Sequence, residues 1–486
     1  MSASNALPGL EPTAVWERFV ELTRIPRPSK QEAAAREHVL AWARARGHET
    51  AVDAEGNTVV RVPASPGREG AVTVVLQSHL DMVCERDPGS PYDPREGRIH
   101  VVLDGDWLAA EGTTLGADNG IGVAAALAVV DDPAIEHGPL ELLFTVSEEQ
   151  GLDGAKALDP SLVAGRLLIN LDGTSDDALT VGCAGSAHTF LRLPLETEPV
   201  GERAVALEVT VSGGRGGHSG GDIASGRANA IKALGRVLSR TFEEAPFGLA
   251  HFAGGASRNA IPREAHARVV MGSSAEEAFR RAAESELAAL RRQFVATEPD
   301  LALSIERSQV EAASSTEATG RVLDLVAALP TGVLAMNPGV PGAVETSTCL
   351  TVATTDDETV TLASMARSSN AAALDEVVSR LEALARLAGA EIEVKRSYPP
   401  WQPDFDSRLL ATARATFERL FERAPGLEIV HGGLECAVIG DKLPGINMVS
   451  IGPEIVGLHA PGERLRISST QRFYKLLGAL LDDLSR

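Results

Sequence analysis

Two adjacent carboxylates, Glu148 and Glu149, follow an apolar, alternating run over residues 141–146. The run predicts a strand that ends at the pair, where a loop begins. Because successive side chains of an extended chain point in opposite directions, one carboxylate can bind a cation while its neighbour carries a proton. We assign the cation to Glu149 and the proton to Glu148. Two adjacent glutamates are also common in a solvent-exposed acidic turn. The interpretation therefore depends on the other candidate residues in the chain.

Further side chains suited to metal chemistry follow other apolar runs. His79 and Asp81 come after a predicted strand over residues 72–76. Period-two geometry places both on one face, so Asp81 can accept a hydrogen bond from the imidazole while the other ring nitrogen binds a metal. Asp118 precedes a predicted helix of small residues over 123–130, where an ordinary helix N-cap is the alternative reading.

Two more candidate ligands complete the set. Asp172 follows the apolar residues 167–171, and His459 lies in a loop punctuated by glycine and proline. The carboxyl ends of strands in an open α/β sheet are where ligands bind. Two histidines and three carboxylates exceed one closed tetrahedral site, but they suit two cations that share a carboxylate. Nitrogen and oxygen ligands without thiolate favour zinc, with manganese or cobalt as substitutes.

Six short motifs in this order resemble those of the dinuclear zinc dipeptidases, the family that includes aminoacyl-histidine and cytosolic non-specific dipeptidases. The motifs are residues 78–83 (Ser-His-Leu-Asp-Met-Val), 115–120 (Leu-Gly-Ala-Asp-Asn-Gly), 147–152 (Ser-Glu-Glu-Gln-Gly-Leu), 170–173 (Asn-Leu-Asp-Gly), 213–219 (Gly-Gly-Arg-Gly-Gly-His-Ser) and 457–459 (Gly-Leu-His). The resemblance runs over most of the chain, from about the first predicted helix to the last.

The resemblance implies a role for each residue of the candidate centre. His79 and Asp172 complete one zinc site, Glu149 and His459 complete the other, Asp118 bridges the two, Asp81 orients His79, and Glu148 is the general base. It also implies the reaction: metal-dependent hydrolysis of the peptide bond in dipeptides, including Xaa-His dipeptides such as β-alanyl-histidine. A small peptide is the expected partner.

Substrate-binding residues are expected outside the metal motifs. His218, in the glycine-rich residues 213–221, is the candidate donor to the negative tetrahedral intermediate. A nucleotide-binding loop is excluded there, since the stretch lacks the required lysine and glycine spacing. By resemblance, Asn259 and Arg367 bind the C-terminal carboxylate of the substrate. Glu435, at a predicted strand-to-helix turn, is a candidate for the substrate's amino group, with a helix-start carboxylate as the alternative.

The order of predicted elements changes along the chain. Strands and helices alternate up to about residue 182, which is typical of an α/β fold, and two rounds of an α+β pattern follow. Because His459 must meet His79, the middle segment is predicted to interrupt one domain. We therefore predict a zinc-exopeptidase-like α/β catalytic domain, with a central mixed sheet flanked by helices, over residues 1–185 and 399–486. Residues 186–398 form an inserted α+β lid domain of two linked β-α-β-β-α-β-like units.

Composition limits the class of partner. The 486 residues include 45 basic and 67 acidic side chains, for a formal charge of −22, which argues against nucleic acid and anionic membranes. No apolar run approaches the ~20 residues that span a bilayer. The first residues lack a basic region followed by an apolar core, and the four cysteines lack metal-binding spacing. These observations predict a cytoplasmic enzyme.

Two alternatives use the same motifs. An N-acyl amino acid deacylase or desuccinylase shares the metal and base residues, but such relatives carry a lid of about half this length that must dimerise. The doubled lid can replace a partner subunit, so we expect a monomer or a homodimer. A non-catalytic peptide-binding homologue is disfavoured, because Glu148 and all five candidate ligands are present.

Overall fold

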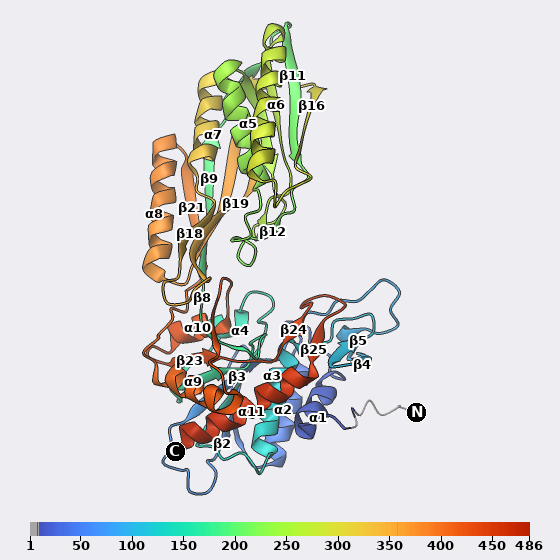
Figure 1. Ribbon diagram of the computed structural model, residues 1–486, viewed down its shortest axis with the longest axis vertical. Helices are drawn as coiled ribbons and strands as arrows, with labels where there is room; N and C mark the ends of the chain where they lie inside the picture. The colour runs from blue at the N-terminus through green and yellow to red at the C-terminus, as the bar shows by residue number, and fades with distance from the viewer. Residues whose placement is uncertain (1–6, 8, 357) are drawn as a thin grey trace. The chain divides into compact units, whose positions relative to one another are not determined.

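The computed structural model describes residues 7, 9–356 and 358–486, which divide into two compact units (Figure 1). Unit 1 comprises the chain up to Gly182 together with Pro403–Ile429 and Leu434–Arg486. Unit 2 comprises Cys183–Gln402 and the short segment Val430–Gly433.

Unit 1 is built on an eight-stranded sheet in the order β1-β2-β6-β3-β7-β23-β8-β22. Its strands are β1 (Glu49–Val52), β2 (Thr58–Val62), β3 (Val74–His79), β6 (Leu140–Thr145), β7 (Leu167–Asn170), β8 (Ala178–Cys183), β22 (Gly426–Val430) and β23 (Asn447–Ser450). Strand β3 runs parallel to β6 and β7, and β23 runs parallel to β7. Every residue of β3 and β6 is buried, as expected for central parallel strands covered on both faces.

Helices surround this sheet. They are α1 (Thr13–Leu22), α2 (Ala33–Ala45), α3 (Ala117–Asp131), α4 (Asp153–Ala157), α9 (Arg408–Phe421), α10 (Glu435–Lys442) and α11 (Ile467–Ser485). Residues 119–129 of α3 are all buried, which explains why alanine, glycine and valine dominate them. None of the helices among the described residues is long and apolar enough to cross a membrane.

A small four-stranded sheet completes unit 1, in the order β24-β25-β5-β4. Its strands are β4 (Val101–Asp104), β5 (Trp107–Ala110), β24 (Ile455–Val456) and β25 (Arg464–Arg466). Because β24 and β25 pair antiparallel, the residues between them form a hairpin loop. That loop carries His459, so the small sheet holds this histidine in place.

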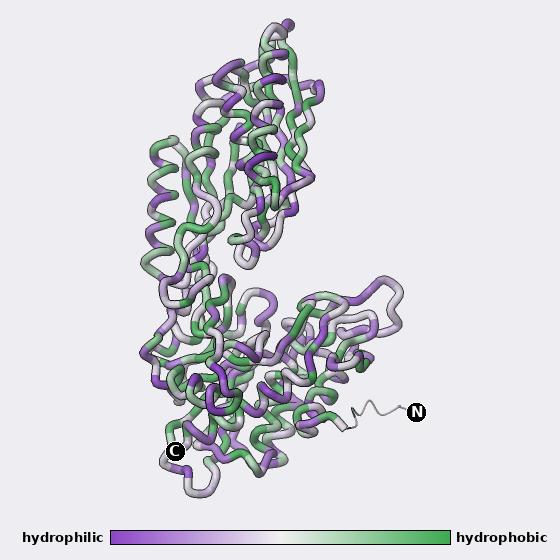
Figure 2. The backbone as a smooth tube through the Cα atoms, in the orientation of Figure 1, coloured by the Kyte–Doolittle hydropathy of each residue, from purple (hydrophilic) through white to green (hydrophobic). Residues whose placement is uncertain are grey.

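Unit 2 contains a nine-stranded antiparallel sheet in the order β16-β11-β15-β13-β19-β20-β9-β21, with β18 paired to β19. Its strands are β9 (Gly185–Pro194), β11 (Ala204–Ser212), β13 (Gly248–Gly254), β15 (Ala265–Gly272), β16 (Ala302–Ser308), β18 (Gly332–Met336), β19 (Val344–Asp356), β20 (Thr359–Ser368) and β21 (Glu391–Tyr398). Helices α5 (Ala230–Glu244), α6 (Glu276–Gln293), α7 (Thr316–Ala328) and α8 (Ala371–Ala388) pack on one face (Figure 1). Hydrophobic and hydrophilic residues alternate along them, as Figure 2 shows, because each helix buries one face.

The nine-stranded sheet contains two β-α-β-β-α-β units joined edge to edge. The first is β11-α5-β13-β15-α6-β16, and its strands lie in the spatial order fourth, first, third, second. The second is β9-α7-β19-β20-α8-β21, and it has the same order. Strands β13 and β19 join the two units. The sequence pattern indicated two consecutive rounds, whereas the first unit is inserted between β9 and α7 of the second.

Candidate metal centre and active site

The candidate ligands of unit 1 gather at the carboxyl ends of its parallel strands. His79 is the last residue of β3, Glu149 follows β6, and Asp172 follows β7. Because these strands are parallel neighbours, their ends lie at one edge of the sheet. Asp118 and Asn119 have non-helical backbone angles within α3, so the first turn of that helix is kinked at Asp118.

Asp118 lies between the two histidines. Its Oδ1 is 3.0 Å from Nε2 of His79, and its Oδ2 is 3.2 Å from Nε2 of His459. Each oxygen of one carboxylate therefore faces a different imidazole, which is the arrangement that a shared carboxylate between two cations requires.

Asp172 and Glu149 complete two separate clusters. Oδ1 of Asp172 is 3.6 Å from Nε2 of His79, and Oε2 of Glu149 is 3.0 Å from Nε2 of His459. Potential ligand atoms lie within 4.8 Å of one another in the set His79, Asp118 and Asp172, and again in the set Asp118, Glu149 and His459. Glu148 forms a third such set with His79 and Glu149, so the predicted base lies beside both clusters.

The charges of the two clusters fit metal cations. Within the described parts of the chain, no lysine or arginine forms an ion pair with Asp118, Glu149 or Asp172. Oε1 of Glu149 is buried and has no hydrogen-bond partner there. Buried carboxylates without a counter-charge are costly, and imidazole with carboxylate is a donor set that zinc, manganese and cobalt accept.

In the metal-free protein, protons take the place of the cations. Burial and the charge of Asp118 raise the pKa of Asp172 to about 7. Burial, together with the charges of Asp172 and other nearby carboxylates, raises the pKa of Glu148 well above its ordinary value. Hydrogen bonds to Asp118 and Glu149 raise the pKa of His459 to about 10. A bound cation replaces these protons, so metal binding must release protons.

Asp81 contacts more of the site than the sequence pattern indicated. Its Oδ1 is 3.3 Å from Nδ1 of His79, the pair predicted from the sequence, although the geometry is not that of a hydrogen bond. The same carboxylate also accepts the backbone N–H of Glu148 at 3.0 Å, that of Glu149 at 3.1 Å, and the Ser29 hydroxyl at 2.7 Å. Burial opposes ionisation of Asp81, but these bonds and His79 outweigh it and lower the pKa to about 2. Asp81 therefore fixes a histidine and the Glu148–Glu149 backbone together.

Glu435 is the first residue of α10 and is only 1% exposed. Its Oε2 accepts hydrogen bonds from the Gln77 amide at 2.6 Å and the Thr145 hydroxyl at 2.7 Å. Its Oε1 is buried without a partner in the described chain. Burial raises the pKa of this carboxyl group to about 7.

His218 and Asn259 come together in unit 2. His218 lies on β12 (Gly217–His218), which pairs with β14 (Ala260–Ile261), and the Asn259 carbonyl accepts the Ser219 N–H at 2.7 Å. Nδ1 of His218 accepts the backbone N–H groups of Gly220 and Gly221 at 3.2 and 3.0 Å. The neutral ring must then carry its proton on Nε2. Partial burial and the charge of Arg367 lower the pKa of His218, which favours this neutral form.

Arg367 lies on β20 and is 3% exposed. Its neighbour Ala366 belongs to the core beneath the helices, so Arg367 points to the opposite face of the sheet. It donates to the Tyr398 hydroxyl at 3.2 Å, while its buried Nε has no partner. Of the carboxylates in the described chain, none forms an ion pair with this guanidinium. A buried cation without a counter-charge is costly, so this guanidinium has capacity to pair with an anion.

Two residues near Arg367 were not predicted from the sequence. Ser347 faces Arg367 across the β19–β20 pair, and its hydroxyl is 2.7 Å from Nε2 of His431. Burial and the charge of Arg367 lower the pKa of His431 to about 4, so this imidazole is neutral. The signal available for His431 was its position in a His-Gly-Gly turn, but nothing local in the sequence indicated its partner.

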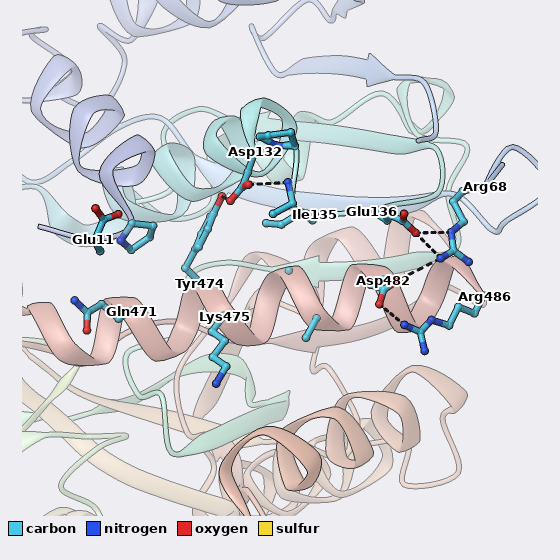
Figure 3. Close-up of a pocket in the computed structure, with 15 residues that line it drawn as sticks. Glu11, Arg68, Asp132, Ile135, Glu136, Gln471, Tyr474, Lys475, Asp482 and Arg486 are labelled. Carbon is cyan, nitrogen blue, oxygen red and sulfur yellow. Dashed lines mark hydrogen bonds and ion pairs between the residues drawn. The ribbon is translucent and has the colours of Figure 1, made fainter. Parts of the chain in front are cut away.

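A groove elsewhere on unit 1 contains none of the predicted site residues (Figure 3). Its volume is about 830 Å³, and it lies along α11. Arg68 pairs with Glu136 and Asp482, and the Tyr474 hydroxyl donates to Asp132. Most charges of this groove pair with one another, and its Lys475 and Glu11, which have no ion-pair partner in the described chain, are not gathered into a cluster of like charge as the candidate ligands are.

Unit 1 is an α/β unit that holds two histidine–carboxylate clusters sharing one aspartate. These features place the protein in the class of proteins with a candidate dinuclear metal centre. Residues 75–483 match the model of peptidase family M20/M25/M40, and the chain belongs to this family.

Individual relatives extend this match over the full chain. The chain is 38% identical over 481 residues to the cytosol non-specific dipeptidase of Escherichia coli strain K12, with 99% of both chains covered. The solved structure of the aminoacylhistidine dipeptidase from Vibrio alginolyticus aligns with a TM-score of 0.90 and 35% identity, covering 98% of this chain and 97% of that one. An aminopeptidase from Bacillus cereus shares the fold, with a TM-score of 0.58, 18% identity and coverage of 98% and 100%. The predicted family and the predicted fold class are confirmed.

Proposed function

We propose that this protein is a dinuclear zinc dipeptidase of the cytoplasm that hydrolyses Xaa-His and other dipeptides. The observation that carries the proposal is the Asp118 carboxylate, whose two oxygens lie 3.0 and 3.2 Å from His79 and His459 in a cluster without lysine or arginine partners among the described residues. The names of the two most similar relatives reported above, one a non-specific dipeptidase and one an aminoacylhistidine dipeptidase, support this substrate class.

Five side chains are proposed to hold two zinc ions, with manganese or cobalt as substitutes. His79 and Asp172 serve one ion, Glu149 and His459 serve the other, and Asp118 serves both. When bound, the two ions lower the pKa of a water molecule in the site and polarise the scissile carbonyl. Asp81 holds the tautomer of His79 in which Nδ1 carries the proton and Nε2 is free to act as a ligand.

Glu148 is proposed as the group that moves the proton. It takes a proton from the attacking water and then delivers it to the leaving amine. Burial and surrounding carboxylates raise the pKa of Glu148, and cations that offset the negative charge of those neighbours lower it again, which leaves Glu148 ionised and able to accept a proton. His218 is proposed to donate its Nε2–H to the developing oxyanion, which its tautomer supports.

Recognition of both ends of the substrate would limit turnover to dipeptides. Arg367 and Asn259 are proposed to bind the C-terminal carboxylate, and the missing counter-charge of Arg367 supports this assignment. Glu435 is proposed to receive the amino group, since an ammonium supplies the donor that its Oε1 lacks. We further propose that unit 2 is a lid whose doubled architecture replaces a partner subunit, so that either a monomer or a homodimer is active.

A substrate panel with metal analysis tests the proposal. Zinc-loaded protein is assayed with β-alanyl-histidine, Gly-His, Ala-Ala, the tripeptide Ala-Ala-Ala and N-acetyl-alanine. We expect two zinc ions per chain, turnover of the dipeptides, and little turnover of the tripeptide or the acylated amino acid. Equal turnover of the tripeptide would exclude recognition of both ends, and preferred turnover of N-acetyl-alanine would identify a deacylase instead.

A further inference from the structure

Glu463 joins two of the segments that carry candidate metal ligands. It follows His459 by four residues and is 2% exposed. Its Oε2 accepts the backbone N–H groups of Leu115 and Gly116 at 2.8 and 2.9 Å. Its Oε1 accepts those of Ala117 and Asp118 at 2.7 and 3.2 Å. One carboxylate therefore anchors the four consecutive N–H groups that lead up to Asp118, the candidate shared ligand.

Arg27 joins the same segment to the one that carries His79. Its NH1 group donates to the carbonyls of Leu80 and Asp81 at 3.1 and 2.9 Å, and its NH2 group donates to the carbonyl of Gly116 at 2.5 Å. Arg27 is 1% exposed, so water cannot substitute for these contacts. A Cβ atom on Gly116 would lie 2.6 Å from NH2 of Arg27, which shows how closely the guanidinium approaches this backbone.

The loop that carries His459 needs such an anchor. His459 has a left-handed backbone with φ of 63°, and Gly462 has φ of 107°. Non-glycine residues adopt this conformation only where their surroundings enforce it. Apart from the short β24–β25 pair, the Glu463 side chain ties the loop to the rest of the site.

We infer that Glu463 and Arg27 are positioning residues that set the separation of the two metal sites. Neither contacts the predicted ligand atoms or the reacting atoms. Glu463 fixes Asp118 relative to His459, and Arg27 fixes Asp118 relative to His79. The inference rests on the proposed dinuclear centre. Glu463 and Arg27 hold the segments that carry His79, Asp118 and His459 at the separations that two ions sharing one carboxylate require.

The test is zinc affinity of a Glu463→Gln variant after metal removal. The amide keeps one acceptor oxygen but directs an NH₂ group at two backbone N–H groups, so the Asp118 segment must move. We expect wild type to bind two zinc ions, and the variant to bind at least one of them 10- to 100-fold more weakly, on the order found for residues that orient metal ligands. Cobalt-substituted protein gives a second readout, because the visible spectrum reports ligand geometry. We expect that spectrum to change in the variant.

Glu141→Gln is the matched control. Glu141 is also a buried carboxylate of unit 1, 3% exposed, and it accepts the backbone N–H groups of Ala164 and Gly165 at 2.9 Å. It lies near the start of β6, whereas the metal clusters follow the end of that strand. We expect Glu141→Gln to lower the melting temperature as Glu463→Gln does, with both zinc affinities and the cobalt spectrum unchanged.

Three results would overturn the inference. Wild-type zinc affinities and an unchanged cobalt spectrum in Glu463→Gln would do so while leaving the dinuclear proposal intact. Equal loss of affinity in the control would reduce Glu463 to a contributor to overall stability. Wild-type protein that binds fewer than two ions would refute the proposed centre and the inference with it. If Glu463→Gln does not fold, Arg27→Lys takes its place, since an ammonium cannot reach all three carbonyls; the same outcomes apply.

Discussion

The polar cluster of unit 1 and that of unit 2 are opposite in charge, and among the described residues the first has no lysine or arginine partner and the second no carboxylate partner. In unit 1 the carboxylates of Asp118, Glu149 and Asp172 are gathered without lysine or arginine partners in the described chain. In unit 2 the buried guanidinium of Arg367 has no carboxylate partner there. Buried charge is stable only when it is compensated. The same rule therefore predicts cations for one cluster and an anionic group for the other.

The pKa values of the histidines in the two clusters are shifted in opposite directions. The pKa of His459 rises to about 10 because of its carboxylate neighbours, whereas the pKa of His431 falls to about 4 because of burial and Arg367. An imidazole near Asp118 thus holds a proton until a cation displaces it. An imidazole near Arg367 stays neutral and is available as a hydrogen-bonding group. Mutations that change one charged or polar group at a time test the metal-binding cluster and the Arg367 cluster separately.

The largest effects are expected from the adjacent glutamates of unit 1. Glu148→Gln removes the proton carrier but no proposed ligand, so we expect kcat to fall by roughly 10³-fold or more while two zinc ions stay bound. Glu149→Gln removes a ligand of the His459-side ion, so we expect loss of that ion together with activity. The measurement is metal content by mass spectrometry alongside dipeptide turnover.

The control for both glutamates is the exposed neighbour Gln150, as Gln150→Ala, which should leave metal content and turnover unchanged. Normal turnover by Glu148→Gln would require a different base. Retention of two tightly bound ions by Glu149→Gln would show that Glu149 is not a metal ligand. The proposal that Glu149 binds metal while Glu148 carries the proton would then be wrong.

Arg367→Lys tests the cluster of unit 2. Lysine keeps the charge but loses the forked geometry that binds a carboxylate with two hydrogen bonds, so kcat/KM for Gly-His should fall by about 10²-fold. The variant should discriminate less between Gly-His and its C-terminal amide than wild type does. Arg192→Lys is the control, because Arg192 is a partly exposed arginine of the same sheet paired with Glu393. Equal loss for peptide and amide would exclude a carboxylate-binding role.

The two clusters also differ in how far the sequence predicted them. Four of the five candidate ligands of unit 1 were predicted because each follows an apolar strand or opens a helix, and parallel strand ends share an edge, whereas His459 was placed only in a loop. Around Arg367, by contrast, Ser347 lies across the β19–β20 hairpin, whose register shifts between Leu350 and Val352, and Tyr398 ends the β21 strand that pairs with β9. Register of this kind is not encoded in local pattern. The same reason explains why the insertion of one β-α-β-β-α-β unit into the other was not predicted.

His218→Ala is expected to have a smaller effect. Loss of the Nε2–H donor should lower kcat by about 10²-fold with little change in KM, because the bond forms to charge that develops in the transition state. Since the pKa of His218 is lowered, its ring is already neutral near pH 7. Titration of His218 should therefore not change kcat between pH 7 and 8. His251→Ala, at a half-buried histidine of the nine-stranded sheet of unit 2, is the control. A proportional rise in KM would indicate ground-state binding instead.

Glu435 gives the smallest effect and tests whether a proton can substitute for a cation near the metal clusters. Its pKa is raised from 4.5 to about 7 by burial, so the folded protein keeps a proton that the unfolded chain releases. Stability must therefore fall as the pH rises from 4.5 to 7, by at most about 3 kcal/mol. Glu435→Gln removes this fall.

Urea unfolding of the metal-free proteins at pH 5 and pH 8 measures the difference between Glu435→Gln and wild type. We expect the variant to gain stability relative to wild type only at pH 8. In a separate activity assay, we expect the variant to lose affinity for substrates with a free amino group. A difference that is the same at both pH values would mean that Glu435 is ionised in the folded protein at pH 5. The acidic region of unit 1 would then extend beyond the metal ligands, and a third positive charge, that of the substrate's amino group, would be needed to balance it.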